Sequence, residues 1–156
     1  MNSQEYAVQA EAMRTRLYKT ALLYLNSSSM ALDAVDEAVY KGLCSCKKLR
    51  QPEHFGTWIT RILINECHNE LRRHKRLCPM EALPETAAEQ FDALPLREAI
   101  ARLPRELKEV VILRYFSGFT LTETAQLLQI PQGTAATRQR RALQLLRMEL
   151  GEEERS

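Results

Sequence analysis

The sequence predicts an all-α protein of two small helical modules joined by a flexible linker, with a helix-turn-helix in the C-terminal module. Three observations predict this fold. Glycine and proline are scarce, at 5 and 6 of 156 residues, which leaves little room for a turn-rich β fold. Ala, Leu, Glu, Arg and Gln dominate, and these residues lose little free energy on entering a helix. Apolar residues recur every three or four positions, as a buried helix face requires.

The N-terminal module is expected to contain three helices, over residues 4–25, 30–47 and 54–76. The apolar residues at helical spacing in each are expected to be buried. The first set is Met13, Leu17, Ala21, Leu22 and Leu25. The second set is Leu32, Val35, Val39 and Leu43. The third set is Trp58, Ile59, Ile62, Leu63 and Leu71.

The third helix ends in a cluster of positive charge, Arg72-Arg73-His74-Lys75-Arg76. The negative end of the helix dipole tolerates cations there. Solvation explains such a cluster as well as contact with a nucleic acid does.

A linker is expected over residues 77–94, between modules at 1–76 and 95–150. The segment holds Pro79 and Pro84, no Lys or Arg, and four acids, Glu81, Glu85, Glu89 and Asp92. Each module carries a net charge of +4, although the whole chain is only +2. Two basic modules around an acidic strip suggest two contacts with one polyanion, joined by a segment that avoids it.

The C-terminal module begins near Leu96 with a helix, and Pro104 fits the first turn of the next one. That helix should end near Ser117, because Gly118 is a natural residue for a helix end. Thr120 and Glu123 then form a capping box. A short helix over 121–128, a turn at 129–131 and a last helix from 132 to about 150 complete a helix-turn-helix.

The last helix divides into two faces. Ala135, Ala142 and Leu146 should face inward, with Ala125 of the short helix giving close approach and Leu128 and Ile130 anchoring the turn. The opposite face offers hydroxyl, guanidinium and amide groups, the types that read base edges and phosphates. These residues are Thr137, Arg140, Arg141 and Gln144. An ordinary amphipathic hairpin with a solvated basic face is the simpler alternative.

Several function classes find little support. No apolar run approaches the ~18 to 20 residues of a membrane span, and the N-terminus lacks a signal-peptide core, so we expect a cytoplasmic protein with no membrane insertion. The four cysteines lack the C-x-x-C spacing of a zinc or redox site. Glu66, His68 and Glu70 are close enough to suggest a metal or acid–base site, but a solvated helix face explains them better. We expect no enzyme activity and no cofactor.

Two motifs carry a resemblance to a known family. Leu103–Ala142, LPRELKEVVILRYFSGFTLTETAQLLQIPQGTAATRQRRA, resembles region 4 of bacterial sigma-70 factors. DAVDEAVY at Asp33–Tyr40 and FGTWITRILIN at Phe55–Asn65, followed by Leu71-Arg72-Arg73, resemble region 2. Two such regions on an 18.0 kDa chain are typical of the extracytoplasmic-function (ECF) group.

The resemblance implies a sigma factor that binds core RNA polymerase, recognises promoters and starts transcription, often in a stress response. It implies polymerase contacts at Asp33, Asp36, Glu37 and Tyr40. Contacts with the opened minus-ten strand are implied at Trp58, Arg61, Asn65, Arg72 and Arg73, with residues 47–54 forming a loop near a flipped base. Minus-thirty-five contacts are implied at Thr134, Ala136, Thr137, Arg138, Arg140, Arg141 and Gln144. An anti-sigma factor is the further partner that the family implies.

The sequence departs from the family pattern at Ala135, Ala136 and Gln139 of the last helix, and at Gln129 of the turn, which often holds glycine. These departures affect the promoter sequence that is read rather than the class. The alternative function is a helix-turn-helix repressor or activator that acts without binding the polymerase core. A response regulator of that kind normally carries an α/β phosphoacceptor domain, and residues 1–76 show no pattern of parallel strands.

Overall fold

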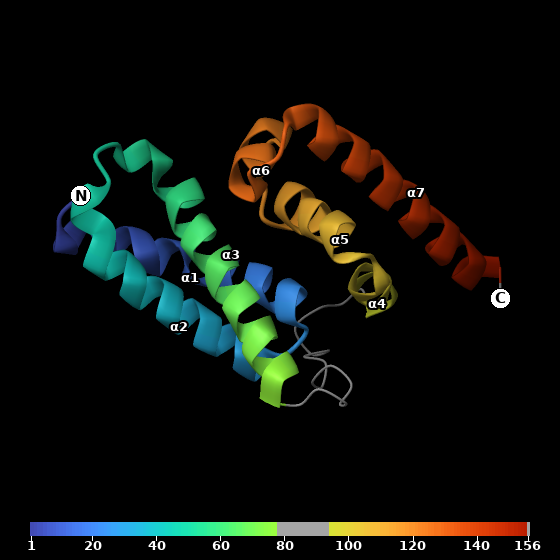
Figure 1. Ribbon diagram of the computed structural model, residues 1–156, viewed down its shortest axis with the longest axis horizontal. Helices are drawn as coiled ribbons and strands as arrows, with labels where there is room; N and C mark the ends of the chain where they lie inside the picture. Colours follow the sequence, from blue (N-terminus) through green and yellow to red (C-terminus); the bar gives the residue numbers. More distant parts are fainter. Residues whose placement is uncertain (78–93, 156) are drawn as a thin grey trace. The chain divides into compact units, whose positions relative to one another are not determined.

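The computed structural model describes residues 1–77 and 94–155, and every regular element within them is helical (Figure 1). The predicted all-α class is therefore confirmed. The chain divides into two units, residues 1–86 and 87–156, and each is described by itself. The acids expected at 81, 85, 89 and 92, and nearly all of the expected linker, lie outside the described residues. No described helix is long and apolar enough to cross a membrane.

The N-terminal unit is a bundle of three helices, each packed against the other two. They are α1 (Ser3–Leu25), α2 (Ser28–Ser45) and α3 (Phe55–Leu77). Two 3₁₀ turns, η1 (Cys46–Lys48) and η2 (Pro52–His54), lie in the connection between α2 and α3. All three helices fall within a few residues of their predicted ranges.

Local capping explains where α1 and α2 begin. Asn2 accepts a hydrogen bond from the Glu5 amide at 2.8 Å, and the Glu5 carboxylate accepts one from the Asn2 amide at 3.4 Å. Asn26 ends α1 in the left-handed conformation, with φ 52°. The Ser27 hydroxyl then accepts from the Met30 amide at 3.3 Å. These bonds satisfy amide groups that a helix start leaves without partners.

The buried stripe predicted for α2 is wrong at two of its four positions. Leu32 and Leu43 are 50% and 45% exposed, Val39 is half-buried, and only Val35 is buried. The buried face is instead made of small residues, together with Val35: Ala31, Ala34, Ala38 and Gly42. Small residues let α2 approach α1 and α3 closely, and this close packing, rather than the largest apolar side chains, decides which face is inside. The stripe on α1 is confirmed, with only Met13 half-buried.

The C-terminal unit contains α4 (Leu94–Arg102), α5 (Arg105–Val111), the π-helical turn η4 (Ile112–Phe116), α6 (Leu121–Leu128) and α7 (Gln132–Arg155). Helices α5 and α6 both pack against α7. The capping box is confirmed, because Thr120 accepts from the Glu123 amide at 3.1 Å and Glu123 accepts from the Thr120 amide at 2.9 Å.

Three local predictions for this unit need correction. Pro104 precedes the first residue of α5 as its cap rather than lying in the first turn. Helix α7 continues past the expected end near residue 150, because a single glycine at 151 costs a helix only about 1 kcal/mol. Leu128 and Ile130 are half-buried and Leu127 is the buried leucine beside the turn, because each residue of a helix turns its side chain by about 100°.

Candidate nucleic-acid interface

The exposed face of α7 is made of the polar residues that the sequence predicted. Thr137, Arg140, Arg141 and Gln144 are exposed, whereas Ala135 and Ala142 on the opposite side are fully buried. The Thr137 hydroxyl donates to the Gly133 carbonyl at 3.0 Å and accepts from the Arg140 guanidinium at 3.4 Å. The two side chains are therefore held together on one surface of the helix.

Two of the other three α7 residues of the predicted set lie toward α5. Thr134 and Arg138 line a groove of about 530 Å³ between α5 and α7, together with Leu107 and Leu145. Ala136 is half-buried. The predicted set is therefore divided, with Thr137 and Arg141 lining both the groove and the exposed face.

The turn before α7 fixes the direction in which this face points. Gln129 adopts the left-handed conformation with φ 57°, and the Ile130 amide donates back to the Ala125 carbonyl at 3.0 Å. Thr122 near the start of α6 donates to Gln132 at the start of α7, at 3.2 Å. These contacts join the two helices of the helix-turn-helix at their turn, so the polar face is presented by a rigid pair.

Helix α3 presents a second set of predicted residues. Trp58 and Arg61 are half-buried and Asn65 is exposed, and their spacing of three and four residues places them on one side of the helix. The Trp58 ring lies 6.0 Å from the Phe55 ring and 6.4 Å from the Tyr6 ring, measured between centroids. The sequence predicted Trp58 as part of the core, and this aromatic cluster is the packing that holds it.

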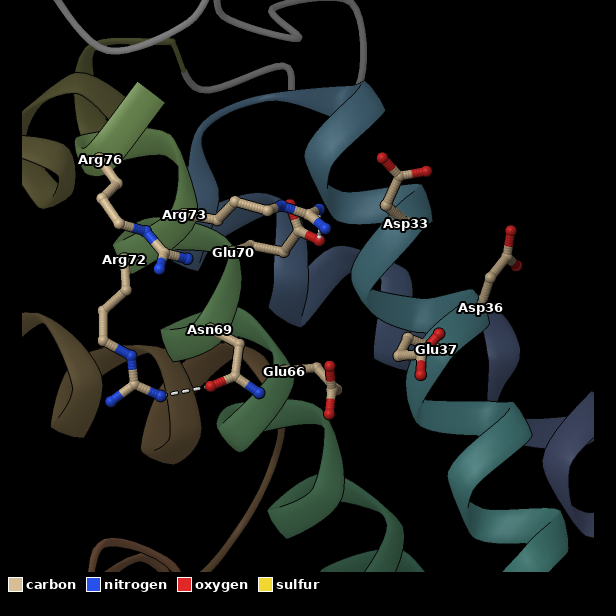
Figure 2. Close-up of a pocket in the computed structure, with 9 residues that line it drawn as sticks. All are labelled: Asp33, Asp36, Glu37, Glu66, Asn69, Glu70, Arg72, Arg73 and Arg76. Carbon is tan, nitrogen blue, oxygen red and sulfur yellow. Dashed lines mark hydrogen bonds and ion pairs between the residues drawn. The ribbon is translucent and has the colours of Figure 1, made fainter. Parts of the chain in front are cut away.

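The basic end of α3 is already engaged by neighbouring side chains. Arg72 donates to the side-chain amide oxygen of Asn69, and Arg73 pairs with Glu70, each partner lying three residues earlier (Figure 2). Both arginines remain exposed. The guanidinium groups are therefore ordered on the surface and accessible to an anion.

These arginines face the acids of α2 across a groove. Figure 2 shows the carboxylates of α2 on one side and the α3 side chains on the other. The groove has a volume of about 910 Å³, and its lining residues are Asp33, Asp36, Glu37, Glu66, Asn69, Glu70, Arg72, Arg73 and Arg76. The hydrogen bond to Glu70 raises the pKa of Arg73, and the charges of Asp33 and Glu37 raise it further. The predicted DNA contacts and polymerase contacts thus share one electrostatic environment.

Ion pairs fix the walls of this groove. Lys41 of α2 pairs with Glu66 of α3, whose side chain is only 8% exposed. Arg14 of α1 pairs with Asp36 at 2.8 Å. Glu66 and Glu70, considered above as a metal or acid–base site with His68, therefore both hold cationic side chains, and no cluster able to bind a metal is found among the described residues.

The outer face of α2 combines acidic and apolar side chains. Asp33, Asp36, Glu37 and Tyr40 are all exposed, as predicted. The exposed Leu32 and Leu43, which the sequence analysis assigned to the core, join Tyr40 at 61% exposure on the solvent side of the same helix. The run of small residues at positions 31, 34, 38 and 42 is the signal that could have identified the true buried face.

Comparison with known proteins connects the two units to one family. The sequence model "Sigma-70 region 2" matches residues 10–77, and "Sigma-70, region 4" matches residues 93–146. RNA polymerase sigma factor SigV of Bacillus subtilis is 33% identical over 144 residues, covering 89% of this chain and 87% of that protein. The chain belongs to the sigma-70 family of RNA polymerase sigma factors.

Other relatives agree with this assignment. The ECF RNA polymerase sigma factor SigM of Mycobacterium tuberculosis is 28% identical, covering 87% of this sigma factor and 72% of SigM. The fold matches the sigma factor RpoE of Bartonella quintana, solved with the anti-sigma factor NepR, at a TM-score of 0.81 and 20% identity, covering 95% and 98% of the two chains. CnrH, solved with the cytosolic domain of CnrY, matches at 0.77 and 18% identity, covering 96% and 90%.

The family assignment decides between the two functions considered. The region 2 match spans most of α1 and all of α2 and α3, which an ordinary helix-turn-helix regulator leaves unexplained. This ECF sigma factor binds core RNA polymerase and directs promoter recognition and transcription initiation.

Proposed function

We propose that this sigma factor works through three helices: α2 binds the polymerase core, α3 with the loop before it holds the opened minus-ten strand, and α7 reads the minus-thirty-five element. The main support for this proposal is that the polar residues predicted for each role are largely exposed, on helices whose opposite faces are buried. Residues 77–94 connect the two units in this proposal.

The composition of the α2 face supports polymerase binding. An exposed tyrosine and two exposed leucines supply apolar area, and three carboxylates supply charge. Protein interfaces commonly combine an aromatic and apolar centre with charged groups that steer the approach of the partner. The partner surface is therefore expected to be basic around an apolar centre.

The charge and exposure of α3 and the preceding segment support contact with the opened strand. Lys47, Lys48 and Arg50 are exposed in that segment, and Arg72 and Arg73 are exposed at the other end of α3. Cations that follow a backbone, with an aromatic ring between them, are the usual means of holding single-stranded DNA. We assign residues 47–54, the reading loop, to the flipped minus-ten base.

An anti-sigma factor is the proposed further partner. Two similar folds were solved with such a factor or with the cytosolic domain of another protein. The groove between α5 and α7 exposes Leu145 at 36% beside Pro104 and Leu107, which offers an apolar surface to a partner. The protein acts in the cytoplasm in this proposal, and it catalyses no reaction itself.

Charge reversal tests the polymerase assignment. The double variant Asp33→Lys, Glu37→Lys should no longer co-purify with core polymerase, while its far-ultraviolet circular dichroism stays unchanged. The control variant Glu11→Lys, Glu53→Lys changes the net charge equally at exposed positions outside α2, and it should co-purify normally. If both variants co-purify with core polymerase, the assignment of α2 to the polymerase interface is wrong.

A further inference from the structure

The reading loop, residues 47–54, has few internal bonds that could fix its shape. The Leu49 amide donates to the Cys46 carbonyl at 3.1 Å, and the His54 amide donates to the Gln51 carbonyl at 3.0 Å. Leu49 is the buried side chain of the loop, and its other residues are exposed. The loop is also held at Leu49, whose carbonyl accepts from the Met1 amino group at 2.8 Å. Apart from this bond, the geometry of such a short segment is set by how its two ends are held.

Tyr6 of α1 holds the end of α2 that leads into the loop. Its hydroxyl donates to the Val39 carbonyl at 2.5 Å, and the side chain is only 2% exposed. Gly42 makes room for it, because a Cβ there would lie 2.3 Å from the Tyr6 hydroxyl oxygen. The last turns of α2 are therefore packed directly against this tyrosine.

The same ring holds the start of α3, where the loop ends. The rings of Tyr6 and Phe55 meet edge to face, with centroids 5.8 Å apart and planes at 76°. The rings of Tyr6 and Trp58 meet at 90° with centroids 6.4 Å apart. Aromatic pairs of this geometry contribute beyond their buried area and fix ring orientation.

We propose that Tyr6 is a positioning residue for promoter reading, which sets the distance and direction between the two ends of the reading loop. This inference rests on the proposed function of that loop. Tyr6 itself is buried in the core of the unit, so it is not a residue that reads the base directly. Its effect on the DNA is exerted through Val39, Phe55 and Trp58.

Burial of the Tyr6 hydroxyl is consistent with a permanent structural bond. Burial, with smaller contributions from the charges of Cys46 and Cys44, raises the Tyr6 pKa to about 12. The hydroxyl therefore remains a hydrogen-bond donor to Val39 at every pH at which transcription is measured.

The test separates positioning from general stability. Initiation is measured with core polymerase on four promoters that differ only at the flipped minus-ten base. Tyr6→Leu should reduce the preference for the best base over the worst on the order of tenfold, as a small misplacement of contacting groups does. Tyr6→Phe keeps the ring contacts and should retain most of the preference.

Leu22→Ala is the matched control. Leu22 is fully buried on the same helix, sixteen residues from Tyr6, which is about 24 Å along the helix axis. This variant should lower the melting temperature of the unit and leave the base preference unchanged. If Tyr6→Leu lowers initiation equally on all four promoters, as a merely destabilised protein would, the proposal is overturned.

A loop variant distinguishes the role of Tyr6 from the role of the loop. Arg50→Ala with Gln51→Ala alters exposed loop residues without touching the aromatic cluster. If this variant changes the base preference and Tyr6→Leu does not, the role of Tyr6 is wrong and the role of the loop stands. If neither changes it, the loop assignment and the Tyr6 proposal fail together.

Discussion

Replacing Gly42 by alanine tests how closely α2 is packed. Alanine is favoured over glycine inside a helix by roughly 0.5 to 1 kcal/mol, so an uncrowded site would be stabilised. At Gly42, however, the new Cβ would lie 2.3 Å from the Tyr6 hydroxyl oxygen and 2.8 Å from the Ile59 Cδ1 atom. Neither neighbour can withdraw easily, because Tyr6 is 2% exposed and Ile59 is fully buried.

The opposing contributions give the expected change in the free energy of unfolding for Gly42→Ala. Overpacking of a core costs about 1 to 3 kcal/mol, and loss of the bond from Tyr6 to the Val39 carbonyl adds about 0.5 to 1.5 kcal/mol. After the helix preference of alanine is subtracted, Gly42→Ala should lower the free energy of unfolding by about 0.5 to 4 kcal/mol.

Trp58 provides the assay, because it is the only tryptophan of the chain and lies in the N-terminal unit. Urea unfolding followed by its fluorescence therefore reports this unit alone. Gly56→Ala is the control, since its Cβ would meet Met13 only at ordinary contact distances of 3.8 Å and more. It should be neutral or slightly stabilising. A Gly42→Ala protein as stable as the wild type would refute the close packing of α2.

Three further outcomes are expected. Arg140→Ala or Arg141→Ala should weaken promoter binding by about 1 to 3 kcal/mol if the residue contacts a base, and run-off transcription at wild-type level in the double variant would remove α7 from the reading role. Gln129→Gly should stabilise the C-terminal unit by about 1 kcal/mol, because Gln129 has φ 57°; slower amide hydrogen exchange in α6 and α7 is the measurement, and faster exchange would contradict it. Burial raises the Tyr6 pKa to about 12 from an ordinary ~10. The neutral hydroxyl therefore contributes about 2 to 3 kcal/mol to the free energy of unfolding below pH 10, and this contribution is lost as the pH rises towards 12. Urea unfolding across that range should show a smaller loss in Tyr6→Phe, and parallel losses would exclude the buried hydroxyl as the cause.

The sequence was most informative where structure depends on neighbours along the chain. The bounds of α6, the capping box at Thr120 and the left-handed glycine at 118 follow from short-range hydrogen bonding and backbone sterics. The polar face of α7 follows from helical spacing in the same way. These features need no knowledge of the rest of the fold.

The sequence was less informative where structure depends on contacts between distant residues. The ion pair of Lys41 with Glu66 joins positions 25 residues apart, and the Tyr6 bond to Val39 joins positions 33 apart. Neither pair leaves a periodic pattern in the chain. Size and hydropathy predict Leu32 in the core, but the close approach that small residues permit decides the buried face and leaves Leu32 exposed.

The engaged arginines at the end of α3 have a consequence for how DNA binding responds to ionic strength. A free cation that meets a phosphate releases a condensed counterion from the DNA, which makes affinity fall steeply as salt is added. In the proposed contact with the opened strand, Arg73 instead exchanges the Glu70 carboxylate for a phosphate, and the freed carboxylate attracts cations from solution. The net release of ions is therefore smaller than for an arginine that pairs with no carboxylate beforehand. Binding through this end of the helix should therefore depend less on salt than its number of positive charges indicates.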